Sequence, residues 1–68
     1  MIKVNDIPAY VLDPSYKMTH IIAAKHKDGY LQYRQCFGSK GAATKRMKLS
    51  KERFPDVEFY MFSINELN

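Results

Sequence analysis

The chain has 68 residues and a net charge of +4, with 46% apolar residues, 26% charged residues, five Tyr and four Phe. This length allows one domain, 1–68, and the aromatic content argues against an intrinsically disordered body. The single cysteine excludes an intramolecular disulfide, and no apolar run approaches the roughly 20 residues of a membrane-spanning helix, so we expect a cytoplasmic protein.

The first segment, residues 2–14, carries mixed signals. Ile2-Lys3-Val4 alternates as a short strand does, and Tyr10-Val11-Leu12 favours a second short strand. Pro8 and Pro14 restrict the residues before them and disfavour a helix. We expect this segment to form an edge strand or to close one end of the domain.

Residues 16–37 predict a β-hairpin with arms 16–26 and 30–37. The Asp28-Gly29 pair between the arms is typical of a two-residue type I′ turn, in which both central residues take a positive φ. This loop would pair Lys27 with Tyr30, Ala24 with Tyr33, Ile22 with Gln35 and His20 with Phe37. The buried face of the hairpin would then hold Met18, Ile22, Ala24, Leu31, Tyr33 and Phe37.

Residues 39–54 predict an α-helix. Ser39 is a suitable N-cap because its hydroxyl can accept a hydrogen bond from a free amide of the first turn. Pro55 disfavours helical geometry at Phe54 and ends the helix there. A narrow stripe with helical spacing would face the sheet: Ala43, Met47, Ser50 and Phe54.

Residues 57–64 predict another strand, with apolar side chains on both faces. The fold class is therefore α+β: a three- or four-stranded antiparallel sheet in ββαβ order, with one basic helix packed on one face. The expected core comprises Met18, Ile22, Ala24, Leu31, Tyr33, Phe37, Ala43, Met47, Phe54, Val57, Phe59 and Met61.

The excess positive charge is concentrated in the predicted helix. Residues 40–53 contain six Lys or Arg and one acid, Glu52, a net charge of +5 that leaves −1 for the other residues. Such a field favours polyanions, and the alternative is a solvated face that keeps the protein soluble. The predicted contacts with a partner or nucleic acid are Lys40, Lys45, Arg46, Lys48, Lys51 and Arg53, together with Lys25, Tyr30 and Arg34 of the hairpin.

A second candidate surface is the face of the last strand that points away from the helix, with Tyr60, Phe62 and Ile64. Aromatic side chains on a sheet can stack on bases or form a protein interface. The third possibility is that they pack beneath residues 2–14.

We expect neither a metal site, nor a cofactor, nor catalytic residues. His20 and His26 would lie roughly 20 Å apart along one strand, too far to share an ion. Cys36 lies in mid-strand beside Phe37, which is typical of a packed, inert thiol. The seven acids are scattered, and the sequence contains no established metal-binding or nucleotide-binding motif.

Two resemblances bear on function. The order hairpin, Phe37-Gly38-Ser39-Lys40-Gly41-Ala42-Ala43, helix resembles the arm-binding domains of tyrosine recombinases and the plant AP2 domains, but this chain adds a strand after the helix. In size and predicted topology the chain also resembles small phage and mobile-element proteins that inhibit host machinery. That second resemblance implies a compact inhibitor without an active site and assigns no residue.

Three functions follow as hypotheses. The first is a small non-enzymatic module, of phage type, that docks its basic helix on an acidic protein surface or nucleoprotein complex of the host's nucleic-acid-handling machinery and modulates or inhibits it. The second is a direct DNA or RNA binder with weak sequence selectivity. The third is a structural or homodimerising protein that uses the aromatic sheet face.

Overall fold

The computed structural model describes residues 2–67. The main elements follow in the order β1 (His20–Lys25), β2 (Leu31–Phe37), α1 (Lys40–Arg53) and β3 (Phe59–Ser63). The strands form one antiparallel sheet in the spatial order β2-β1-β3. The predicted α+β class with ββαβ order is confirmed.

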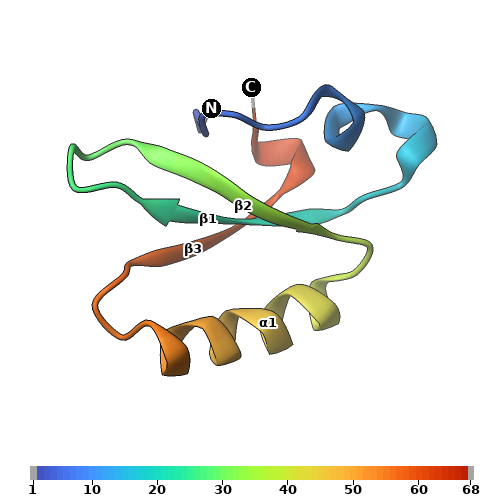
Figure 1. Ribbon diagram of the computed structural model, residues 1–68. Helices are drawn as coiled ribbons and strands as arrows, with labels where there is room; N and C mark the ends of the chain where they lie inside the picture. Colours follow the sequence, from blue (N-terminus) through green and yellow to red (C-terminus); the bar gives the residue numbers. More distant parts are fainter. Residues whose placement is uncertain (1, 68) are drawn as a thin grey trace.

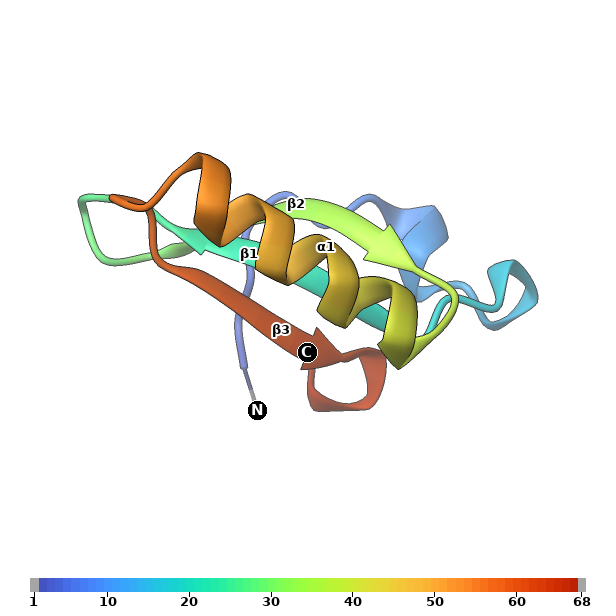
Figure 2. The ribbon, with the colours of Figure 1, turned by 90° about the horizontal axis from the view of Figure 1, so that it is seen from below.

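The sheet lies between two layers. Helix α1 packs on one face, and the N-terminal segment covers the other face (Figure 1). Seen from the helix side, α1 runs along the sheet over β1, between the two edge strands (Figure 2). Within residues 2–67 no helix combines the length and the apolar character needed to cross a membrane.

The N-terminal segment is mostly not strand. It contains the 3-10 helices Ala9–Leu12 and Pro14–Tyr16, so the short strand predicted for Tyr10-Val11-Leu12 is wrong. The prolines that disfavour an α-helix allow these single turns, and Pro14 is itself the first residue of the second one. The segment closes over the sheet through Val11, which is almost fully buried.

The core consists of two clusters, one on each face of β1. On the helix side Ile22, Phe37 and Ala43 are buried, with Met47, Phe59 and Met61 packed around them. The buried residues on the opposite side are Val4, Val11, Ile21, Ala23 and Leu67. Because both faces of β1 are covered, four consecutive residues, 21–24, are buried.

The hairpin turn differs from the prediction. His26 and Tyr30 close a three-residue loop, with the His26 amide donating to the Tyr30 carbonyl at 2.8 Å. Gly29 has φ +94°, but Asp28 is not among the residues with positive φ. The type I′ turn is therefore wrong, and the loop is of the three-residue kind that ends with a glycine in a left-handed conformation.

The three-residue loop shifts the pairing of β1 with β2 by one residue relative to the predicted register. A bulge in β2 restores the predicted register beyond it. Ala23 pairs with Tyr33, and Ile22 pairs with Gln35, so Arg34 is the extra residue. The predicted pairing of Ala24 with Tyr33 is wrong, whereas the pairing of His20 with Phe37 beyond the bulge is confirmed.

The shift moves two side chains to the other face of the sheet. Leu31 and Tyr33 pack under the N-terminal segment and not against α1 as predicted. Phe54 and Val57 were also expected in the core, but they are 56% and 37% exposed. Phe54 follows the last helical residue with φ −130°, so it no longer continues the buried stripe.

Candidate functional site

Helix α1 is defined at both ends by the residues that predicted it. The hydroxyl of Ser39 accepts a hydrogen bond from the Ala42 amide at 3.2 Å. At the other end the Phe54 amide donates to the Ser50 carbonyl at 2.9 Å, and Pro55 follows. These two signals fix the predicted helix at Lys40–Arg53.

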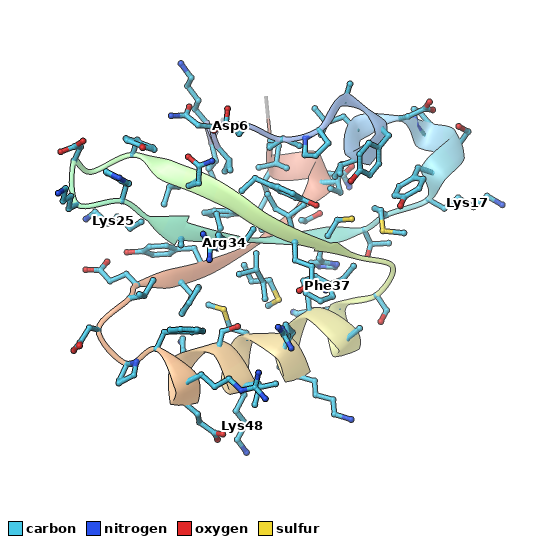
Figure 3. All side chains as sticks on the ribbon, viewed as in Figure 1. Asp6, Lys17, Lys25, Arg34, Phe37 and Lys48 are labelled. Carbon is cyan, nitrogen blue, oxygen red and sulfur yellow. The ribbon has the colours of Figure 1, made fainter. Side chains whose placement is uncertain are left out.

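The buried side of α1 sets the direction of its cations. Ala43 is fully buried against Ile22 and Phe37. A helix turns by about 100° per residue, which directs Lys45 and Lys48 away from the sheet. Figure 3 shows Lys48 pointing away from the sheet in this manner.

The other four cations divide between the two flanks of α1. The hydroxyl of Thr44 lies 3.9 Å from the sulfur of Met61, which marks the β3 side. Helical spacing places Lys40 and Lys51 on that side and Arg46 and Arg53 on the β2 side. The helix therefore has a lysine flank above β3 and an arginine flank above β2.

The cations of α1 have no acidic partner within the part of the chain that the structure describes. Within residues 2–67 the close approach of a basic to an acidic side chain is that of His26 Nδ1 to Asp28 Oδ2, 3.4 Å apart in the hairpin loop. All six Lys and Arg of α1 are exposed. Their charge therefore acts outward and is neutralised by solvent ions or by a partner.

An open hollow of about 550 Å³ lies on the outward face of α1. The half-buried Leu49 lies in this hollow, beside the aliphatic stems of the cations. The hollow is lined by Ala42, Lys45, Arg46, Lys48, Leu49 and Glu52. This face therefore combines positive charge with apolar contact area.

A second hollow, of about 170 Å³, separates α1 from the edge of β2. Arg34 and Arg46 both line this hollow, together with Phe54, and we call it the arginine hollow. The bulge directs Arg34 toward the helix side of the sheet, where Figure 3 places its side chain. The sequence predicted both arginines as contact residues but placed Phe54 in the core. Pro55, which follows Phe54, was the signal that the apolar stripe of the helix ends before it.

The hairpin residues Lys25 and Tyr30 lie apart from the arginine hollow. Lys25 lines a hollow with Lys27, Asp56 and Glu58, where two acids balance two lysines. Tyr30 stacks on His26 with ring centroids 4.5 Å apart. The structure thus places Arg34 beside Arg46 of α1, whereas Lys25 lies in a hollow whose lysines and acids balance.

The aromatic face of β3 lies partly under the N-terminal segment. Phe62 and Ile64 pack against the buried cluster there. Tyr60 is 37% exposed and its hydroxyl donates to Glu58 Oε2 at 2.6 Å. This carboxylate raises the pKa of Tyr60 because it stabilises the protonated hydroxyl.

The described residues contain no cluster of three or more His, Cys, Asp or Glu that could hold a metal ion. Cys36 is half-buried. The pKa of the Tyr33 hydroxyl is raised, mainly because the hydroxyl is partly buried and to a smaller extent because it lies beside the side chain of Cys36.

Comparisons with protein-family models, with curated proteins and with solved structures gave no match. The function therefore has to be inferred from the surface of this molecule.

Proposed function

We propose that the protein is a small non-enzymatic binding module that docks α1 on an acidic surface of a nucleic-acid-handling protein complex and modulates that complex. The observation that carries this proposal is the set of six exposed cations on α1, which have no acidic partner within residues 2–67. Attraction to an acidic surface would speed association and fix the orientation of the bound module.

The outward hollow favours a protein surface as the partner. Phosphates interact with cations and hydrogen-bond donors, and gain little from an apolar side chain. Leu49 offers an apolar contact in the middle of the charged face, with Ala42 beside it. An apolar centre within a polar rim is the usual arrangement of a protein–protein interface.

Direct binding of DNA or RNA is the second candidate, and the arginine hollow supports it. Two guanidinium groups, Arg34 and Arg46, can each bind a phosphate in a bidentate manner. The exposed ring of Phe54 beside them could stack on a base. This arrangement suits a single strand with little sequence preference.

A pull-down from nuclease-treated and untreated host lysate separates the two candidates. The wild-type protein is compared with Lys45→Glu/Lys48→Glu and with the control Lys3→Glu/Lys27→Glu, which makes the same charge change at exposed positions outside α1. We expect one nucleic-acid-handling complex to be recovered by the wild-type protein and the control after nuclease treatment, and lost with the α1 variant.

Other results decide against this proposal. If recovery requires intact nucleic acid, the direct binder is favoured. If all three proteins recover the same partners in equal amounts, α1 is not the contact surface.

A further inference from the structure

The two edges of the sheet are protected to different degrees. On β2, the Asn5 amide donates to the Leu31 carbonyl at 2.8 Å, and the Tyr33 amide donates to the Asn5 carbonyl at 3.0 Å. The bulge at Arg34 further interrupts that edge. Strand β3 pairs only with β1 among the described residues, and its sequence FYMFS carries no charge, proline or bulge to protect the edge.

The hydrogen-bond pattern identifies the free groups of β3. The Lys25 amide donates to the Glu58 carbonyl, and the Ile64 amide donates to the Thr19 carbonyl, both at 2.9 Å. Because bonding alternates along an antiparallel strand, the even-numbered residues 58–64 face β1 and the odd-numbered residues face outward.

Phe59 and Met61 have backbone groups at this outward edge that are unpaired within residues 2–67. Ser63 also faces outward, but its amide already donates to Glu66 Oε1 at 2.9 Å. The amides and carbonyls of Phe59 and Met61 therefore form a short, unused pairing edge. Such alternating donors and acceptors match a peptide backbone, whereas the phosphates of a nucleic acid can only accept.

The lysine flank of α1 lies above the same edge. The distance from Lys40 to Lys51 along a helix is about 16 Å, similar to the length of about 17 Å expected for a five-residue strand. A strand added beside β3 would direct every second side chain toward this flank. Acidic side chains at those positions would meet Lys40 and Lys51.

We propose that the free edge of β3 binds a short, extended, acidic segment of the protein partner as a fourth strand, with acids at alternate positions facing α1. This inference rests on the proposed function, because it requires α1 to face an acidic protein partner. A second copy of the chain is disfavoured as the occupant, since β3-to-β3 pairing would bring together two helical segments that each carry a net +5 over residues 40–53.

Amide hydrogen exchange measured by NMR tests the pairing with a defined probe, a synthetic peptide of alternating Glu and Thr. At saturating peptide we expect exchange of the Phe59 and Met61 amides to slow by at least about tenfold. The amides of Tyr60 and Phe62, already bonded to β1, should change little. A single-stranded DNA of equal charge serves as the control ligand.

Two variants test separately the backbone donor of β3 and the lysine flank of α1. A chemically synthesised chain with an N-methylated Met61 keeps the side chain but loses the outward donor, and we expect it to lose the protection at Phe59. N-methylation of Lys27, in the exposed loop, is the matched control. Lys40→Gln/Lys51→Gln should weaken peptide binding by several-fold while the edge remains intact.

The remaining outcomes overturn the inference. Peptide binding that perturbs α1 without protecting Phe59 and Met61 excludes strand addition and leaves the docking role of α1 standing. Absence of peptide binding at millimolar concentration, or equal protection by the DNA, also excludes it. Protection that rises with protein concentration alone would show that a second copy occupies the edge.

Discussion

Arg34 of β2 and Arg46 of α1 line the same hollow, with the exposed ring of Phe54 beside them. Neither guanidinium has a carboxylate partner among the described residues. Two like charges at one hollow repel each other, and an anion bound there would relieve this repulsion. The bulge makes the arrangement possible, because it directs Arg34 to the helix side.

Substitution of Arg34 should therefore affect nucleic-acid binding more than substitution of a distant cation. If the protein binds single-stranded DNA, Arg34→Gln should weaken it and reduce the slope of log affinity against log salt by about 1. Fluorescence anisotropy over a salt series measures this slope. The control Lys3→Gln should leave it close to that of the wild-type protein, and equal slopes for both variants would exclude the hollow as a phosphate site.

Two glycines should respond in opposite directions to alanine. Gly29 has φ +94°, so Gly29→Ala should destabilise the fold by about 1 kcal/mol or more. Gly41 lies in the first turn of α1 with open space around its Cα, so Gly41→Ala should stabilise the fold by about 0.5 kcal/mol. Urea unfolding checks both values. A Gly29→Ala variant as stable as the wild-type protein would contradict the loop geometry, and a destabilised Gly41→Ala variant would contradict the open space at the first turn of α1.

A larger side chain at position 43 should destabilise the fold, because Ala43 packs directly against the sheet. Ala43 is 0% exposed, so Ala43→Leu should cost about 1–3 kcal/mol through overpacking. The adjacent Ala42 is exposed, and Ala42→Leu should be close to neutral. Thermal unfolding of the pair tests which side of α1 faces the sheet. Equal losses would show that the helix is rotated relative to this description.

Alkaline pH should destabilise the fold through Tyr33. Burial raises the pKa of its hydroxyl in the folded state above the ordinary value of about 10. The stability that this provides is complete below pH 10 and is lost as pH rises toward the folded pKa, because the unfolded chain ionises first. We expect Tyr33→Phe to lose less stability between pH 9 and pH 11 than the wild-type protein in urea unfolding. An equal loss would contradict this role.

The helix could be predicted from the sequence because local signals define it completely. Ser39 and Pro55 act within one turn of the chain, and the spacing of Ala43 and Met47 sets the buried side. The same positions predicted which cations point outward. The direction of Lys45 and Lys48 therefore needed no information from distant residues.

The two sheet faces could not be predicted in the same way. The local Asp28-Gly29 signal fits both a two-residue and a three-residue loop, and the choice between them changes the face of Leu31 and Tyr33. Only packing decides it, since Tyr33 becomes covered by the N-terminal segment. The placement of that segment depends on long-range contacts, such as that of Asn5 with β2, which residues 2–14 alone do not reveal.

The most direct test of the docking role of α1 is the affinity of the purified partner complex for two charge-reversed proteins, measured by calorimetry at low and high salt. Lys45→Glu/Lys48→Glu should weaken binding by at least about tenfold at low salt and remove most of its salt dependence, whereas Lys3→Glu/Lys27→Glu should retain both. Equal affinities and equal salt dependence for the two proteins would contradict the assignment of α1 as the contact surface.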